Sequence, residues 1–236
     1  MGLRSAVALT LLACAGPAPL RAEEATELPT KVTLSAYVSA GETNFDLNVR
    51  RKFGNLVAWV GDFVAPHGED QGRLGAEYDY QRGVALVVPT VQVGTNGLVA
   101  GQLYSELGGR VYAIAGYSRT NLKPFFNLSW DPNESLQLGA GGHLGADRLY
   151  GWVIFDVRLH TGQQSTHLLW RHPLGHDRLT VDALYKSGRT DEGRDVHAAG
   201  LSLAYDRRAV FVRAAYDPYV NFSADHMVRL GAGFRF

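Results

Sequence analysis

Apolar and polar residues alternate along most of the chain, and this alternation constrains the fold more than any other feature. Successive side chains of a β-strand point to opposite faces, so period-two alternation indicates strands with one apolar and one polar face. In one segment Leu179, Val181 and Ala183 alternate with Thr180 and Asp182. The same pattern recurs in residues 44–50, 73–80, 136–144, 153–160, 199–206 and 210–217. No long window keeps a helical period, so the sequence predicts an all-β protein.

Short turn-forming sequences separate the alternating segments. Thr95-Asn96-Gly97 and Asp131-Pro132-Asn133 are of the kind that joins the two strands of a hairpin. The chain shows no linker, low-complexity tract or change of composition, so we expect one domain after the leader. If a strand and its turn take roughly 16 residues, this domain holds about thirteen strands, and bacterial membrane barrels have an even number. Twelve strands are therefore the preferred count and fourteen the alternative.

The beginning of the chain has the organisation of a secretory signal peptide. Arg4 provides a positive charge, residues 6–15 form an apolar region, and Gly16-Pro17-Ala18-Pro19 ends it. The apolar region is too short to cross a bilayer as a helix, which takes about 20 residues. We expect cleavage after the small residue Ala22, so that residues 1–22 are removed and residues 23–236 form the mature domain.

An alternative processing site lies within the same leader. Leu11-Leu12-Ala13-Cys14 resembles a bacterial lipobox, and in that case Cys14 would become a lipidated N-terminus. The other interpretation is that Cys14 is only a small apolar residue of the signal peptide.

Composition excludes several classes of protein. The 23 Lys and Arg residues balance 23 Asp and Glu residues, so the chain lacks the basic surface that nucleic-acid binding needs. A single cysteine excludes a disulfide scaffold and a thiolate metal cluster. There is no Gly-rich phosphate loop. We therefore expect no nucleic-acid partner, no metal and no cofactor.

Charged residues inside the alternating segments favour a membrane barrel over a soluble β-sandwich. Asp46, Glu77 and Asp156 would stand near the centres of strands, where a packed soluble core would have to pair each charge. A water-filled barrel interior accepts such charges. Aromatic residues also recur near the ends of the segments, as in the interfacial belts of membrane barrels; they are Tyr37, Trp59, Trp130, Tyr150, Trp152, Trp170, Tyr185, Tyr205 and Tyr216.

The C-terminal segment carries the most specific signal in the chain. Five apolar residues alternate there with Arg and Gly, and the last of them ends the chain; they are Val228, Leu230, Ala232, Phe234 and Phe236. This segment resembles the C-terminal β-signal of Gram-negative outer-membrane barrels, which the barrel-assembly machinery reads. The resemblance implies a single transmembrane, antiparallel, up-and-down β-barrel in the outer membrane, in contact with lipids and lipopolysaccharide. An exposed apolar edge strand is an aggregation hazard, so we expect this strand to close the barrel against residues 31–39.

The expected size of the barrel favours a channel. Barrels of about eight strands are filled by side chains, and those of about sixteen to eighteen enclose a wide pore, so twelve to fourteen strands predict a narrow one. In size and strand count the chain is similar to small porins that pass acidic oligosaccharides. The leading hypothesis is passive diffusion of small polar or anionic solutes. The candidate lumen-lining residues are Arg50, Arg73, Glu77, Asp79, Asp156, Arg158, His160, Asp182 and Arg213.

These mixed charges allow two interpretations. Rows of acids and bases on opposite walls of a narrow pore would create a transverse field that orients solutes. Alternatively, the charges neutralise one another between neighbouring strands and fill the interior. The basic residues are mostly arginines, which suit contacts with carboxylate or phosphate groups.

The sequence also allows two other functions. The first is an outer-membrane enzyme acting on lipid A or phospholipid, because Ser165 and His167 follow the polar segment that contains Asp156, and a hydrolase needs Ser, His and Asp within hydrogen-bond reach. Their order and spacing match no known motif, and a polar strand facing the lumen is the favoured interpretation. The second is a closed structural or adhesive barrel. Glycines on the polar face weigh against it because they leave space; they are Gly75, Gly139, Gly141, Gly200, Gly231 and Gly233.

Two further polar stretches are assigned to connections between strands. His172 and His176 flank Pro173 and Gly175, which disfavour the helix that would bring the two imidazoles to one metal, so we expect a turn without a metal. Residues 189–197 form the most polar stretch of the chain. We expect them to be the longest extracellular loop.

Overall fold

A computed structural model describes residues 28–68, 70–121, 134–157, 162–190 and 192–236. The predicted leader, with Cys14 and the cleavage site, therefore lies outside the described residues. Within them no helix is long and apolar enough to cross a membrane. The strands are β1 (Thr30–Ser39), β2 (Glu42–Phe53), β3 (Leu56–Val64), β4 (Gln71–Tyr78), β5 (Tyr80–Arg82), β6 (Ala85–Gly94), β7 (Val99–Gly108), β8 (Val111–Thr120), β9 (Glu134–Leu144), β10 (Asp147–Asp156), β11 (Gln164–Leu174), β12 (Asp177–Arg189), β13 (Asp195–Arg207), β14 (Val210–Asp217) and β15 (Met227–Arg235). Two short 3₁₀ turns complete the list, η1 (Thr95–Gly97) and η2 (Val220–Phe222).

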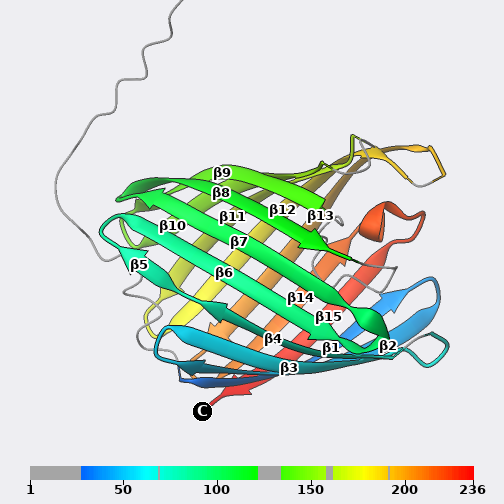
Figure 1. Cartoon of the computed structure of the whole chain (residues 1–236), viewed down its shortest axis with the longest axis horizontal. Coiled ribbons are helices and arrows are strands. Elements are labelled where there is room, and N and C mark those ends of the chain that lie inside the picture. Colours follow the sequence, from blue (N-terminus) through cyan, green and yellow to red (C-terminus); the bar gives the residue numbers. More distant parts are fainter. Residues whose placement is uncertain (1–27, 69, 122–133, 158–161, 191) are drawn as a thin grey trace, which may run out of the picture.

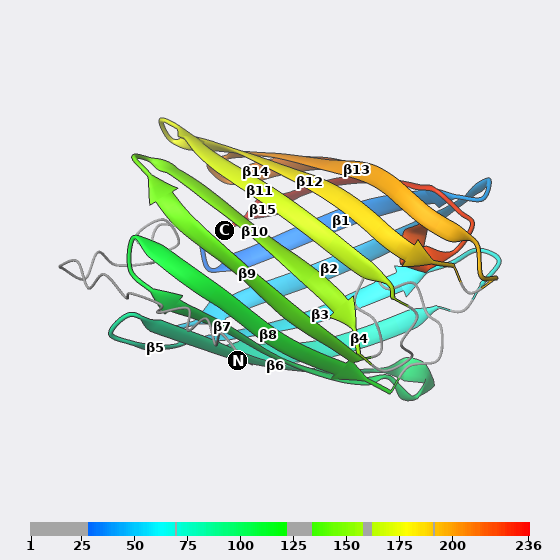
Figure 2. The ribbon, with the colours of Figure 1, turned by 90° about the horizontal axis from the view of Figure 1, so that it is seen from above.

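The strands form one closed antiparallel barrel (Figures 1 and 2). Each strand pairs with its neighbours in the sequence, and β1 pairs with β15 to close the ring. β4 and β5 both pair with β6 and are separated only by Asp79, so they are two parts of one strand. The described residues therefore make a barrel of 14 strands.

The predicted fold class is confirmed, with the alternative count of fourteen strands rather than the preferred twelve. The preferred count was too low because it allowed too much chain for each turn. At one end of the barrel the hairpins turn within two residues, as at Gly54-Asn55 between β2 and β3. The predicted closure is also confirmed, since Lys31 pairs with Arg235 and Ser39 with Met227.

The alternation seen in the sequence divides the barrel into an apolar outer face and a polar inner face. Outward side chains are exposed and apolar, for example Leu34 at 57%, Val91 at 62% and Val111 at 73%. On the other face, Glu106 of β7 and Arg148 of β10 form an ion pair of 2.6 Å although two strands separate them. Such a pair can form only across the concave interior. An apolar outside and a polar inside are what a barrel needs in a bilayer.

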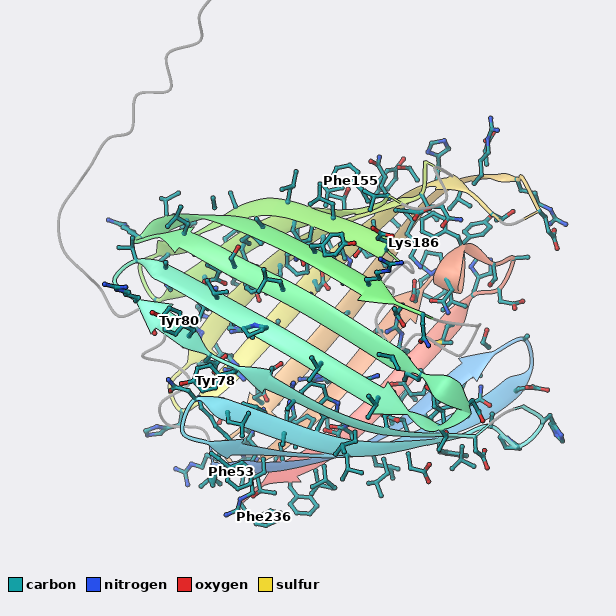
Figure 3. All side chains as sticks on the ribbon, viewed as in Figure 1. Phe53, Tyr78, Tyr80, Phe155, Lys186 and Phe236 are labelled. Carbon is teal, nitrogen blue, oxygen red and sulfur yellow. The ribbon has the colours of Figure 1, made fainter. Side chains whose placement is uncertain are left out.

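The two ends of the barrel differ. Two-residue hairpin turns and the C-terminus lie at one end, here named the turn end (Figure 1). The longer connections lie at the other end, the loop end, together with the short turn at Ala40-Gly41 between β1 and β2. Four exposed aromatic residues stand at the turn end in Figure 3; they are Phe53, Tyr78, Tyr80 and Phe236. Aromatic side chains at this level match the interfacial belt of membrane barrels.

The polar stretch at residues 189–197 is not the longest loop. β12 extends to Arg189 and β13 begins at Asp195. Thr190 accepts a hydrogen bond of 2.8 Å from Gly193 and donates one of 2.8 Å to Arg194, so the connection is a compact turn. The connection between β14 and β15, residues 218–226, is longer. The expectation was wrong because charged residues were taken to end a strand, whereas a barrel strand can continue beyond the apolar layer into water.

The longer connection between β14 and β15 bends into the barrel at the loop end. Val220 and Phe222 of η2 are buried, at 3% and 0% exposure. Val220 joins an apolar cluster with Tyr37, Phe63, Ala65 and Met227, which come from the adjoining wall formed by β15, β1 and β3. This segment therefore fills part of the loop-end mouth.

Aromatic rings lie over several of the inward glycines. A Cβ atom at Gly75 would lie 2.2 Å from the ring of Trp59, and one at Gly233 would lie 2.4 Å from the ring of Phe211. A Cβ at Gly141 would likewise lie 2.5 Å from the ring of Tyr112. The expectation that these glycines leave open space is thus wrong at these positions, because aromatic rings fill that space and lie close to the wall.

Candidate functional site

The structure places the predicted interior residues on the polar face wherever it describes them. Arg50, Arg73, Glu77, Asp79, Asp182 and Arg213 alternate with outward apolar residues along their strands, and Asp156 does so at the end of β10. Arg158 and His160 lie outside the described residues. That these side chains line a conducting path stays a prediction.

One group of charges, on β2 and β4, is largely neutralised. Arg73 forms a salt bridge with Asp46, and both side chains are 7% exposed. Arg50 bonds Glu77 at 2.9 Å and stacks its guanidinium 4.7 Å from the centre of the Trp59 ring. These pairs agree with the second interpretation of the mixed charges, in which acids and bases compensate each other.

A second group joins β7 to β10 and lies beside a cavity of about 290 Å³. Arg148 donates to Glu106 and to the hydroxyl of Tyr112, both at 2.6 Å, and Tyr104 donates to Glu106 at 2.7 Å. The Arg148 guanidinium also lies 4.8 Å from the centre of the Tyr150 ring. Glu77, Asp79 and Arg171 line the same cavity, so this part of the wall carries carboxylates and guanidinium groups side by side.

A third group concentrates positive charge around one aromatic ring, Phe211 of β14. Lys31 and Arg235 lie 4.7 Å from the ring centre and Arg213 lies 5.4 Å from it. Asp206 accepts from Arg235 at 2.5 Å and forms an ion pair with Arg178 at 3.3 Å. We call Lys31, Arg178, Arg213 and Arg235 with Asp206 the Phe211 cation cluster. It holds more cationic than anionic side chains.

Two carboxylates of the groups described above, Glu77 and Glu106, lie on the side of the ring opposite the Phe211 cation cluster. In a ring of 14 strands, β4 is opposite β12, and β7 is opposite β14. β4 and β7 therefore lie across the barrel from β12 and β14 (Figure 1). The first wall carries Glu77 and Glu106, and the second carries Arg178 and Arg213. Both glutamates are themselves paired, Glu77 with Arg50 and Glu106 with Arg148, so these contacts agree with the second interpretation. A net transverse field stays a prediction.

A fourth group is buried near the loop end. Lys186 is 0% exposed and donates to Asp217 at 2.5 Å and to the Tyr219 carbonyl at 3.2 Å. Arg229 forms a second salt bridge with Asp217. Figure 3 shows Lys186 in this part of the barrel. Because Tyr219 precedes η2, the lysine ties the inward-bent connection to β12.

A fifth group consists of Ser165, His167 and Asp182. The Ser165 hydroxyl is 2.9 Å from Nε2 of His167, and Nδ1 of His167 is 3.0 and 3.1 Å from the two oxygens of Asp182. All three line a cavity of about 360 Å³, together with Lys186, Asp217 and Arg229.

The sequence suggests Asp156 as the acid beside Ser165 and His167, but in the structure the carboxylate at His167 belongs to Asp182. The turn at Gly175 between β11 and β12 would have identified Asp182, because it fixes which residues of the two strands lie opposite each other. Pairing back from that turn sets Leu169 opposite Asp182 and His167 opposite Leu184. His167 and Asp182 are therefore diagonal neighbours on one face, which is within reach of their side chains.

His172 points to the outer face at the turn end. Its Nδ1 is 2.5 Å from Asp147, and its ring stacks on Trp170 with 5.2 Å between centres. Asp147 also accepts from the Trp170 indole at 3.0 Å. Among the described residues no group of three or more His, Cys, Asp and Glu side chains could hold a metal ion.

Comparisons with known proteins bear on the fold. No protein-family model matches the sequence, and no curated protein matches it significantly. Several solved structures do match. The outer membrane protein Omp33 of Acinetobacter baumannii aligns with a TM-score of 0.61 at 12% identity, over 89% of this chain and 99% of that one. The fold is that of an outer-membrane porin.

Two further structures support this assignment of the fold. The NanC porin aligns with a TM-score of 0.51 at 11% identity, over 87% of this chain and 100% of that one. A mutant of the Rh. blastica porin aligns with a TM-score of 0.50 at 10% identity, over 89% and 99% of the two chains. The predicted barrel class is confirmed. Its predicted location, the outer membrane of a Gram-negative bacterium, is the one in which this porin fold occurs.

Proposed function

We propose that this barrel is a passive outer-membrane channel for small polar solutes and that it prefers anions. The observation that carries the proposal is the Phe211 cation cluster on the inner wall of a closed barrel. Three cationic groups lie within 4.7 to 5.4 Å of one ring. The one carboxylate assigned to the cluster, Asp206, already forms ion pairs with two arginines. Arginine forks suit carboxylate and phosphate groups.

The opposite wall supports the same proposal. Glu77, Asp79 and Glu106 belong to the side of the ring that faces the cluster. Glu77 pairs there with Arg50 and Glu106 with Arg148, so this wall lacks the excess of positive charge that the cluster has. A solute that carries both hydroxyl groups and an anionic group would turn its anionic end towards Arg213 and its hydroxyl donors towards these carboxylates. Such a transverse field orients the solute during passage. The bent connection at residues 218–226 narrows the loop-end mouth and restricts passage to small solutes.

Reversing charge in the Phe211 cation cluster is expected to change ion selectivity. The double variant Lys31→Glu/Arg213→Glu replaces two cations by two anions on the inner wall. Two charges about 4 Å apart in water interact by about 1 kcal/mol. Because each substitution turns such an attraction for an anion into a repulsion, we expect a shift towards cations of at least about fivefold for each substitution. The measurement is the reversal potential of single channels of residues 23–236 in a planar bilayer under a salt gradient.

The matched control is Arg207→Glu. This exposed residue ends β13 near the turn end and lies on the outer face, so its reversal should leave the reversal potential almost unchanged. Equal shifts in control and double variant would mean that the cluster does not face the ions. A folded wild-type barrel that never conducts would contradict the channel itself and would favour a closed structural or adhesive barrel.

We also propose that residues 1–22 direct export and that the C-terminal strand directs insertion, with the turn end in the periplasm. Short turns are periplasmic in bacterial barrels. Val228, Leu230, Ala232, Phe234 and Phe236 form the outward face of the closing strand and the chain end. Deleting Phe236 is expected to lower the amount of folded barrel in outer-membrane fractions several-fold. Arg235→Lys, which keeps charge and chain length, is the control, and equal yields would exclude a role of the terminal ring in assembly.

A further inference from the structure

We propose that Ser165, His167 and Asp182 form a catalytic triad inside the barrel, which hydrolyses small esters that carry an anionic group. This activity goes beyond the proposed channel function and does not depend on it. The hydrogen bonds run in the order that a serine hydrolase requires: the hydroxyl to Nε2 at 2.9 Å, and Nδ1 to the carboxylate at 3.0 and 3.1 Å.

The surroundings of His167 hold its ring in one orientation. The ring stacks on Trp152 with 4.9 Å between centres and an interplanar angle of 6°. Both oxygens of Asp182 face Nδ1, so the proton of neutral His167 resides on Nδ1 and the lone pair of Nε2 faces Ser165. In this tautomer the histidine is a general base for the serine hydroxyl. The stacking on Trp152 therefore fixes the orientation of the ring, and the contact with Asp182 fixes the tautomer that catalysis needs.

The cavity next to the triad selects the class of substrate. It measures about 360 Å³, which is at the small end of ligand sites. Lys186 is the direct cross-strand partner of Ser165 and lines this cavity with Arg229. Both cations pair with Asp217, which lines the same cavity, so this side of the cavity keeps one net positive charge. That charge favours a substrate with a carboxylate or phosphate, and it favours the negative oxygen that develops during acyl transfer. Because the triad faces the interior, the chains of membrane lipids are not its substrates.

The reaction balances with water as the only co-reactant. Oγ of Ser165 bonds to the ester carbonyl carbon while its proton moves to Nε2 of His167. The bond from that carbon to the alcohol oxygen then breaks, and the leaving oxygen takes the proton from Nε2. Water attacks the acyl-serine, giving one proton to Nε2, and the acid leaves as the Ser165 oxygen regains that proton.

A serine can also be buried for purely structural reasons. The test therefore compares the reactivity of Ser165 with that of a second buried serine, Ser135. Ser165 is 1% exposed, and Ser135 is 3% exposed and bonds the Ser118 hydroxyl at 2.6 Å. The barrel of residues 23–236, refolded in detergent, would be treated with a fluorophosphonate, and the modified residue would be mapped by mass spectrometry. We expect modification of Ser165 in the wild type and in Ser135→Ala, and none in Ser165→Ala.

Ester turnover gives the second measurement, with 4-nitrophenyl hemisuccinate as the anionic ester and 4-nitrophenyl acetate as the neutral one. We expect faster turnover of the anionic ester than of the neutral one. In a triad protease, replacing the aspartate by asparagine lowers kcat about 10⁴-fold, so Asp182→Asn should lower turnover by roughly 10³-fold or more. Circular dichroism and the mobility of unheated samples on gels confirm folding, and His167→Gln replaces Ser165→Ala if that variant does not fold.

Two results would overturn the proposal. One is a folded wild-type barrel whose Ser165 is not modified and whose turnover equals that of Ser165→Ala or His167→Gln. The other is modification of serines without preference for Ser165. Neither result bears on conduction, because the channel is measured separately by its reversal potential.

Discussion

Gly233→Ala is expected to destabilise the barrel by about 3 kcal/mol, at the upper end of the cost of overpacking. Gly233 lies on β15, the strand that closes the ring against β1. A Cβ at this position would lie 2.1 Å from the Val32 carbonyl oxygen and 2.4 Å from the Phe211 ring. The first contact is with backbone, so relief requires the closing strands to move apart. The measurement is the free energy of unfolding in urea, with the barrel in lipid vesicles.

The control lies two residues earlier on the same face of the same strand. A Cβ at Gly231 would lie 3.1 Å from the Ser35 hydroxyl and 3.6 Å from the nearest backbone oxygen, and the serine side chain can rotate away. Gly231→Ala should therefore change stability far less than Gly233→Ala. Equal losses would show that β15 needs glycine for backbone flexibility at both positions and not for the close approach of Phe211.

The same substitution should also disturb the Phe211 cation cluster. The ring of Phe211 can lie against the wall only because Gly233 has no side chain, and Lys31, Arg213 and Arg235 are arranged around that ring. If the variant still forms channels, we expect weaker anion preference as well as lower stability.

Asp217→Ala is expected to cost about 3–5 kcal/mol, the usual penalty for leaving a buried charge without its partner. Asp217 and Lys186 have side chains that are 3% and 1% exposed, 2.5 Å apart. Asp217 also pairs with Arg229. Without the carboxylate the two cations would face each other in the interior, with the Tyr219 carbonyl as the other acceptor of Lys186. Urea unfolding in vesicles gives the free energy.

A double variant separates charge from packing. Lys186→Met/Asp217→Ala removes both charges of the pair, so it should recover a large part of the loss, as for other buried ion pairs replaced by apolar groups. Asp195→Ala removes the partner of Arg189 in a pair whose side chains are 75% and 69% exposed, and should change stability little. A double variant less stable than Asp217→Ala would mean that the lysine chain itself holds residues 218–226 in place.

The sequence alone was sufficient for the class of fold. Alternation with period two depends only on neighbouring residues in the chain. The strands and their two faces could therefore be assigned without a partner strand, and so could the position of Glu77, Asp182 and Arg213 on the polar face. The apolar C-terminal segment likewise indicated the closing pair of β15 and β1, because an apolar edge needs a partner. The number of strands was less certain because it depends on turn lengths, and the compact turn at residues 190–194 showed that charge alone does not mark the end of a strand.

The tertiary structure decided which interior side chains meet. A side chain in a barrel contacts residues on adjacent strands and across the ring, and those contacts depend on register and curvature, which local sequence does not contain. Thus Asp182, and not Asp156, faces His167, and Glu106 reaches Arg148 across two intervening strands. The inward glycines are a second example. A glycine at position 233 predicts open space inside the barrel, and only the tertiary structure shows that the ring of Phe211 occupies it. Local periodicity determined which way each residue points, and the closed ring determined what it contacts.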